Sequence, residues 1–284
     1  ELDADVETLG AAAHFNVPHA WRGLDDCATV ALCPVVPAPV IPAHEVHEVA
    51  RPESADAHAV HARRHDLLLR LAGRTERGTR LGLLRTALLT AAFAPATLAA
   101  LAGKLVAPRS FDRLLRRVRD AFEPPVPTAI DYVAANDSRT ATPEQPRLGF
   151  TDVEQADRVQ ALLRSIGLIS GFATLVSVAG HASHSQNNPH GSAYNCGACA
   201  GRFSGPNARL VCAMANRPAV RALLRERGIG IPEDTWFVGA EHDTCDDVVT
   251  WFDTEDVPAT ARLALDRLQT AVATAGRLHA QERC

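Results

Sequence analysis

The sequence has no excess of basic residues. Its 284 residues include 29 Lys and Arg against 33 Asp and Glu, which gives a formal net charge of −4 and a pI near 6.3. Proteins that bind nucleic acids usually carry a basic patch or a high pI, so the composition argues against a nucleic-acid partner. Hydrophobic residues make up 46% and charged residues 22%. This composition is that of a globular protein long enough to bury a core without disulfides.

A signal peptide and a disulfide framework are also missing. Residues 1–10 are acidic rather than basic and then apolar, which excludes a signal peptide in that stretch. The seven cysteines are odd in number, and only Cys196 and Cys199 are close. This pattern favours a reducing compartment and ligand or free-thiol roles. The chain begins at Glu1, its one methionine is Met214, and its last helical pattern ends uncapped, so we expect an excerpt from a longer protein.

The pattern along the chain predicts four segments. Residues 1–53 form an irregular, proline-rich part of the core, because their prolines exclude a long helix or a central strand. Residues 54–123 predict a helical subdomain, and residues 124–150 predict a linker. Residues 151–284 predict an α/β half-domain. Within the helical subdomain we expect helices over residues 54–71, where Gly73 is a suitable stop, 80–105 and 111–122.

Three patterns in the first half of the sequence suggest a membrane span or a metal site but are better interpreted as ordinary structure. The nearly uncharged run over residues 87–107 has the length of a membrane span, but Pro95 and its many alanines favour a buried helix. The sequence "HEVHE" (44–48) places its histidines three apart, whereas a zincin helix requires four. We interpret it, and the stripe of His58, His61 and His65, as solvated surface.

The second half predicts a parallel sheet. Thr151 and Glu154 have the spacing of a capping box that begins a helix. The uncharged run before His181 is typical of a strand covered on both faces, and residues 235–242 predict a second such strand. Helical patterns lie between the two, as in a βαβ unit. Because ligands bind at the carboxyl ends of parallel strands, we expect the polar segments 180–201 and 241–247 to lie at one edge.

The segment "GHASHSQNNPHGSAYNCGACAG" (180–201) combines histidines and cysteines in one loop. His181 is the first polar residue after the strand, and Cys196 follows 15 positions later, far enough for the loop to fold back. Imidazole and thiolate are zinc ligands. A single Cys-x-x-C lacks the second pair of a zinc ribbon. The residues favour a metal site but leave open a buried thiol cluster and a Cys/His nucleophile.

At this point the sequence resembles a known family. The segments "GHASHSQNNPHGSAYNCGACAGRFSGPNAR" and "GIGIPEDTWFVGAEHDTCDD" are similar to the DabA family, as are "CPVVPAPVIPAHEVHE" and "TLGAAAHFNVP". The resemblance implies an α/β fold with a β-carbonic-anhydrase-like parallel sheet and a helical insertion. It also implies a zinc-binding subunit that pairs with a membrane subunit of the DabB type and converts CO2 to bicarbonate, driven by a cation gradient. Its implied location is peripheral, on the cytoplasmic face of the cell inner membrane.

The resemblance also implies the site residues. By the family pattern, His181 and Cys196 match two Zn²⁺ ligands. The other half of the site is a Cys-x-Asp-x-Arg segment, which this chain lacks, and we expect it in the parent protein just before Glu1. No catalytic residue is assigned here, and the chain alone is expected to bind zinc poorly. Residues expected to support the ligands are Cys199, Asn187, Asn188 and His242.

The chain departs from the family pattern at two positions, and two other functions remain as alternatives. Asn195 stands where the family commonly has Asp, and Ala182 where it commonly has Gly, which affects the tuning of the site rather than its identity. The alternatives are a non-catalytic scaffold that docks a membrane partner and a thiol hydrolase with a Cys nucleophile and a His base.

Overall fold

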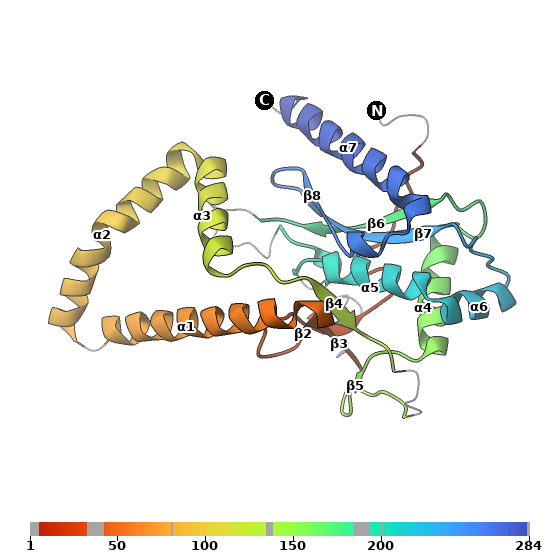
Figure 1. Cartoon of the computed structure of the whole chain (residues 1–284), viewed down its shortest axis with the longest axis horizontal. Coiled ribbons are helices and arrows are strands. Elements are labelled where there is room, and N and C mark those ends of the chain that lie inside the picture. Colours follow the sequence, from red (N-terminus) through yellow and green to blue (C-terminus); the bar gives the residue numbers. More distant parts are fainter. Residues whose placement is uncertain are drawn as a thin grey trace. The chain divides into compact units, whose positions relative to one another are not determined.

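A computed structural model describes residues 6–32, 43–80, 82–134, 139–184, 194–199 and 201–282. The chain divides into two compact units, one formed by Glu1–Glu48 with Ile130–Cys284 and the other by Val49–Ala129 (Figure 1). Helices and strands are mixed, and parallel and antiparallel pairs both occur, which confirms the α/β class. The four-segment division expected from the sequence stays a prediction.

The unit Val49–Ala129 is helical. After a 3-10 turn, η1 (Pro52–Ser54), it consists of α1 (Ala55–Arg80), α2 (Leu83–Val106) and α3 (Pro108–Phe122). The prediction that the first helix stops at Gly73 is wrong, because α1 continues through it for seven more residues. The prediction of a buried second helix is also wrong, since no described residue of α2 is buried.

A first sheet is formed mainly by strands of the larger unit. Its strand order is β2-β1-β3-β4, with β5 also paired to β3. The strands β1 and β3 are parallel, whereas β1 and β2 are antiparallel. The strands β3 and β4 carry the chain into and out of the helical unit. The bounds are β1 (His19–Arg22), β2 (Val30–Leu32), β3 (His44–Ala50), β4 (Thr128–Asp131) and β5 (Arg147–Leu148).

The second sheet, of order β6-β7-β8, carries the candidate site. The strands β6 and β7 are parallel over eight residue pairs, and β8 is antiparallel to β7. Two helices, α5 and α6, connect β6 to β7, which confirms the βαβ unit predicted from the sequence. The bounds are β6 (Leu175–Ala182), η3 (Gly197–Cys199), α5 (Gly205–Asn216), α6 (Pro218–Glu226), β7 (Trp236–Asp243) and β8 (Val248–Trp251).

Helices cover both faces of this second sheet. On one face α5 packs against β6 and β7, and on the other α7 (Ala259–Glu282) packs against β6 and β8, after the 3-10 turn η4 (Thr254–Asp256) (Figure 1). Side chains alternate across a strand, so Phe237 of β7 joins the core under α5 while its neighbour Val238 joins the cluster under α7. Helices on both faces explain why these strands carry an uncharged run, although most residues of β6 are only half-buried.

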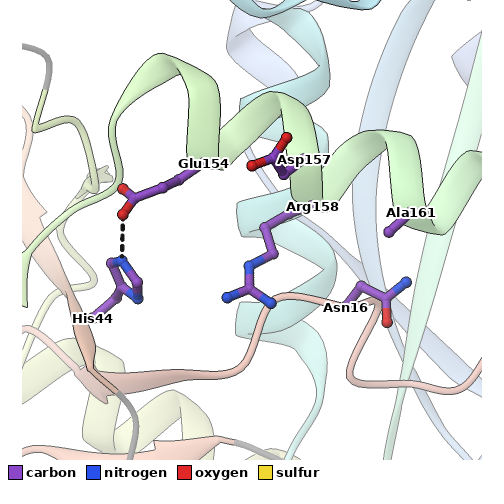
Figure 2. A pocket seen from close by; sticks show the side chains of 6 residues that line it. All are labelled: Asn16, His44, Glu154, Asp157, Arg158 and Ala161. Carbon is purple, nitrogen blue, oxygen red and sulfur yellow. Dashed lines mark hydrogen bonds and ion pairs between the residues drawn. The ribbon is translucent and has the colours of Figure 1, made fainter. Parts of the chain in front are cut away.

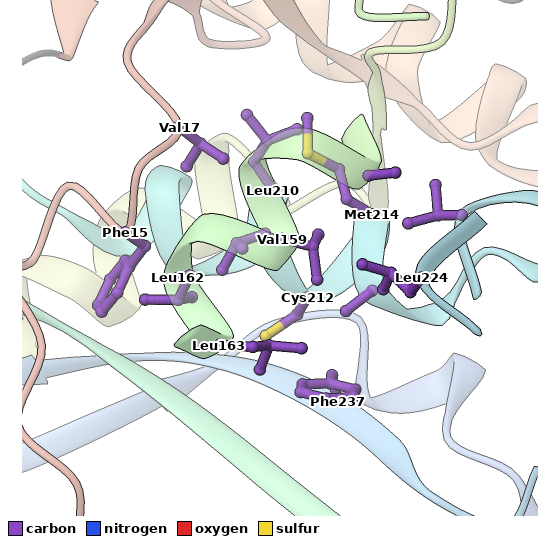
Figure 3. Packing of buried hydrophobic residues seen from close by; sticks show 14 of the residues in the cluster. Phe15, Val17, Val159, Leu162, Leu163, Leu210, Cys212, Met214, Leu224 and Phe237 are labelled. Atoms are coloured by element: carbon purple, nitrogen blue, oxygen red, sulfur yellow. The ribbon is translucent and has the colours of Figure 1, made fainter. Parts of the chain in front are cut away.

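The larger core is built mainly from helices (Figure 3). Its members come from α4 (Asp152–Ser165), α5 and α6, closed by Phe15, Val17 and Phe237. The helix α4 begins with the predicted capping box: Glu154 N–H donates to the Thr151 hydroxyl, and the Glu154 carboxylate accepts from Thr151 N–H at 2.7 Å. This box fixes the start of a helix whose buried face includes Val159, Leu162 and Leu163.

Candidate metal centre

The two polar segments meet at the carboxyl ends of β6 and β7. His181 is the register partner of His242, and Ala182 is the partner of Asp243. The sequence-based expectation that segments 180–201 and 241–247 lie at one edge of the sheet is therefore confirmed for the described residues.

Ser204 fixes the backbone of His181. Its N–H donates to His181 O at 3.0 Å, its hydroxyl oxygen accepts from His181 N–H, and its hydroxyl also lies 3.1 Å from His181 O. The approach requires glycine before His181, since a Cβ on Gly180 would lie 2.6 Å from the Ser204 carbonyl carbon. A serine at the start of α5 thus sets where the imidazole leaves the sheet.

The imidazole of His181 has a defined tautomer. Its Nε2 lies 2.8 Å from the carbonyl oxygen of Tyr194. Because a carbonyl only accepts, Nε2 carries the proton in this arrangement. The neutral ring then keeps its lone pair on Nδ1, and that is the nitrogen able to bind a cation.

Cys196 lies in a tight turn that returns toward β6. Its N–H donates to Arg202 O at 3.1 Å, and its carbonyl accepts from the N–H groups of Cys199 and Gly201 at 3.0 and 2.9 Å. The side chain is 4% exposed. At the start of the same loop, Ser183 N–H donates to Asn195 Oδ1 at 2.9 Å, which ties the residue before Cys196 to the end of β6.

The environment favours a thiolate at Cys196. The hydrogen bond from the Cys199 side chain, helped by the backbone N–H groups of Cys199 and Ala198 and by the nearby imidazole of His181, lowers the pKa of the Cys196 thiol to about 6, although burial opposes this change. Thiolate, not thiol, is the form that binds metals. The imidazole of His181 is thus near enough to act electrostatically on the Cys196 thiol, and the role of the two residues as metal ligands stays a prediction.

The structure describes two of the four residues predicted to support the ligands, and these two have different surroundings. Cys199 is fully buried, and its Sγ also lies 3.7 Å from Ala13 O and 3.8 Å from Asn207 Oδ1. The imidazole of His242 contacts Asp247, with Nε2 3.3 Å from Oδ1. Asn187 and Asn188 lie outside the described residues. Their supporting role stays a prediction.

Sequence reasoning missed several contacts around the edge. His184 Nδ1 lies 2.7 Å from Asp243 Oδ2, and its ring stacks on Phe203 at 4.7 Å. The partners lower the pKa of the Asp243 carboxyl below its ordinary value, mainly through N–H donors from Cys245 and His184, which outweigh burial. The sequence signal for this pair was weak, because Asp243 ends a strand 59 residues after His184.

A buried arginine links the helix α5, which follows the candidate site in the chain, to neighbouring carboxylates. Arg209 of α5 is 5% exposed and binds both oxygens of Asp253, at 2.6 and 2.7 Å, and Glu48 of β3 at 2.8 Å. These carboxylates raise the pKa of Arg209 despite its burial. The glycine at position 239 lets β7 approach, because a Cβ there would lie 2.8 Å from Arg209 Cα. This ion cluster ties the first sheet to α5.

The motif "HEVHE" lies in a strand rather than on solvated surface, so that interpretation is wrong. His44 is buried, stacks on Phe150 at 4.1 Å and contacts Glu154 at 3.2 Å beside a hollow of about 220 Å³ (Figure 2). His47 instead contacts Glu45 at 3.1 Å. Positions of opposite parity face opposite sides of a strand, so His44 and His47 do not form a two-histidine site.

The helix histidines also depart from the expected exposed stripe. His61 is buried, with Nδ1 3.0 Å from Pro124 O, and His65 Nδ1 lies 2.8 Å from Glu123 Oε1. Both therefore contact the segment that closes the helical unit, and His58, like His65, is half-buried.

Comparison with known proteins covers the whole chain. The family model DabA, described as probable inorganic carbon transporter subunit DabA, matches residues 1–284. Proteins with that name are similar to this chain: one from Methylococcus capsulatus is 50% identical, one from Dechloromonas aromatica 49%, and one from Geobacillus thermodenitrificans 35%, each over 100% of this chain. The chain spans 26%, 28% and 31% of these relatives. No solved structure matches it.

Proposed function

This chain belongs to the DabA family, and from that premise we propose that it is part of the zinc-binding subunit of an inorganic carbon pump. In this proposal the whole protein lies peripherally on the cytoplasmic face of the cell inner membrane and pairs with a membrane subunit of the DabB type. It converts CO2 to bicarbonate, driven by a cation gradient. The names of the relatives support a transporter subunit, and the chemistry is inferred from the family resemblance together with the site.

One observation carries the zinc assignment. His181, with its lone pair on Nδ1, and Cys196, with its lowered thiol pKa, lie in one environment at the carboxyl edge of a parallel sheet. An imidazole nitrogen and a thiolate are donors that suit zinc. They supply two of the four ligands that such a site usually needs, so the remaining ligands come from elsewhere in the proposal.

The free edge of β6 is where a strand with those ligands would bind. Trp236 N–H donates to Thr174 O and Thr244 N–H to Ala182 O, so even-numbered peptide groups of this strand face β7. In a parallel pair, the odd-numbered groups then face the other edge. Ser204 occupies that edge only at His181. In the described structure, β7 is the one strand paired with β6.

A parallel strand added at this edge would end beside His181. Uncharged edge strands are ready templates for another strand, and β6 carries no charged residue. We place the family's Cys-x-Asp-x-Arg segment there, because the chain spans only about a quarter of its relatives. Its Cys and Asp would then complete the ligand set.

The residues of this chain would bind and orient the metal ion rather than carry out a chemical step of their own. A bound zinc ion lowers the pKa of its water to about 7, which supplies hydroxide at neutral pH for attack on CO2. Ser204 holds the backbone of His181, Tyr194 fixes the tautomer of its ring, and Cys199 keeps Cys196 ionised. Such neighbours of metal ligands set ligand orientation and basicity.

A thiol hydrolase is the alternative with one observation in its favour, the lowered pKa of the Cys196 thiol. Catalytic cysteines are partly exposed, whereas Cys196 is 4% exposed. Its burial in a turn beside Cys199 fits a metal ligand better than a nucleophile that must reach a substrate.

The test uses the longer parent protein with its membrane partner in a strain whose growth in air requires a carbon pump. We expect His181→Ala to abolish growth rescue and to remove bound zinc together, because both depend on the same imidazole. The matched control His58→Ala changes a half-buried histidine of α1, outside the candidate site, and should leave both unchanged. Rescue by a His181→Ala variant that folds and has no zinc would support the scaffold function and contradict the pump.

A further inference from the structure

The helical unit Val49–Ala129 differs in charge from the rest of the chain. It contains 14 Lys and Arg against 7 Asp and Glu, a formal net charge of +7, whereas the remaining residues contain 15 against 26, which is −11. The overall value of −4 conceals this division. A basic part of this kind is attracted to anionic surfaces, whereas the acidic remainder is not.

Within this unit α2 exposes an apolar surface along its whole length. The 18 residues 86–103 are uncharged, with Arg85 and Lys104 on either side, and none of the helix's described residues is buried. Leu83 is 93% exposed and Val106 84%. An apolar surface of this extent marks a protein or membrane interaction site. Its exposed large residues are Leu83, Leu84, Leu88, Phe93, Leu98, Leu101, Leu105 and Val106.

The next helix, α3, separates its apolar and basic residues. Phe111, Leu114, Leu115, Val118 and Phe122 recur at spacings of three and four and share one face. All of these except Phe111 are exposed.

Arginines outnumber the two acidic residues, Asp112 and Asp120, on the remainder of α3, although Arg116 is paired with Asp112. At 100° per residue, Arg113 and Arg116 lie opposite the apolar stripe, and Arg117 and Arg119 lie at its two borders. Arginines at such borders extend their charged ends toward headgroups while their stems cover apolar surface. A basic amphipathic helix of this kind lies in the plane of a membrane interface.

The fold of the unit argues that α2 lies along a membrane rather than across it. Arg64 of α1 donates to the carbonyl oxygens of Ala121 and Phe122, and His65 Nδ1 lies 2.8 Å from Glu123 Oε1. The end of α3 is therefore fixed to α1. If α2, about 36 Å long, crossed the bilayer, α3 would have to cross back with its arginines, which is costly.

We propose that α2 and α3 form a docking surface for an anionic lipid bilayer, with both helices in the interfacial plane. The apolar stripe of α3 and the length of α2 enter the acyl boundary, and the arginines bind phosphate headgroups. The charge division favours lipid over an apolar protein groove, because interface cores between proteins are depleted of charge. This inference deepens the proposed peripheral location and does not depend on zinc or on CO2 chemistry.

The experiment is vesicle flotation of the 284-residue chain. Vesicles contain phosphatidylcholine alone or with 30% phosphatidylglycerol, at low and high NaCl. We expect binding to the anionic vesicles that weakens in high salt, since the attraction is screened. Leu98→Glu/Leu101→Glu should abolish flotation, and Arg116→Gln/Arg117→Gln should weaken it about thirtyfold, at about 1 kcal/mol for each basic residue.

Matched controls lie on α7 of the other unit. Leu263→Glu/Leu278→Glu changes two exposed leucines, and Arg267→Gln/Arg277→Gln makes the same change in net charge. Both pairs should float as the unaltered chain does, and circular dichroism should show equal helix content in all variants. No flotation with anionic vesicles, or equal loss in the control pairs, would overturn the proposal and leave a protein partner as the occupant. Failure here would not affect the zinc test above.

Discussion

At the scale of single residues, neighbours determine which atoms of the proposed ligands can bind a cation. The carbonyl of Tyr194 places the proton of His181 on Nε2, and the thiol of Cys199 stabilises the thiolate of Cys196. Both neighbours are within 13 residues of the group they act on. The loop therefore prepares two donors before any cation binds.

Which residues would form the site could be partly predicted from the sequence. His181 was identifiable because it is the first polar residue after an uncharged strand, and Cys196 because it closes the same loop. Ser204 and Arg209 were not, because their roles depend on close approaches at Gly180 and Gly239 that only the folded sheet creates. A local pattern carries no signal for such long-range contacts.

His19 makes the stability of the larger unit depend on pH. Its ring is fully buried, Nδ1 lies 2.7 Å from Val17 O, and Nε2 has no partner among the described residues. Burial lowers the pKa of His19 from 6.5 to about 4. The unfolded chain thus binds the proton more readily between these values, so stability falls as the pH falls from about 6.5 and levels off below about 4.

The expected loss from His19 is about 2 kcal/mol in unfolding free energy at pH 5 relative to pH 7.5. Urea denaturation at the two pH values measures it. His19→Gln removes the titrating group, so that variant should lose correspondingly less between the two pH values, whatever its stability at pH 7.5. His44, whose pKa is also lowered by burial, acts in the same direction and remains in both proteins. An equal loss in both proteins would contradict this account.

At the scale of helices and strands, the uncharged runs and the apolar pattern between them predicted the elements of the second sheet correctly. The strands β6 and β7 and the helix α5 lie where an uncharged run, a second such run and the intervening apolar pattern predicted them. The helix end at Gly73 was wrong because residues after it support the helix, with Arg77 Nε donating to Gly73 O and Arg80 contacting Glu76 at 2.5 Å. Glycine ends a helix only when the following residues do not continue it.

The capping box of α4 provides a prediction at this scale. Thr151→Ala removes the side-chain acceptor of Glu154 N–H, and we expect the unfolding free energy to fall by about 1 kcal/mol. Thermal and urea denaturation measure the change. The matched control is Thr270→Ala on α7, whose hydroxyl donates only to Asp266 O within its own helix. It should cost less than half as much, and equal costs would show that the cap contributes nothing.

At the scale of the whole molecule, total composition concealed the feature that matters most. A net charge of −4 gave no indication of a basic unit, since +7 in Val49–Ala129 is cancelled by −11 elsewhere. The apolar run of α2 likewise had two interpretations, a buried helix and a membrane span, and its exposure excludes the first. Charge and hydropathy become informative only when the fold assigns each residue to a unit.

The chain spans about a quarter of its relatives, and the proposed site is divided in the same way. In the proposal this chain would contribute His181 and Cys196 at one edge of a sheet, and the added strand would contribute the rest. Because two donors hold zinc far less tightly than four, the metal content should depend on which part of the protein is present.

Zinc analysis after dialysis against a chelator tests the central claim most directly. We expect the 284-residue chain to retain far less than one zinc per molecule, and the longer parent to retain one. His181→Ala and Cys196→Ser in the parent should each remove it, whereas His58→Ala should not. A stoichiometric, chelator-resistant zinc in the isolated chain, or full zinc in the His181→Ala parent, would contradict the account.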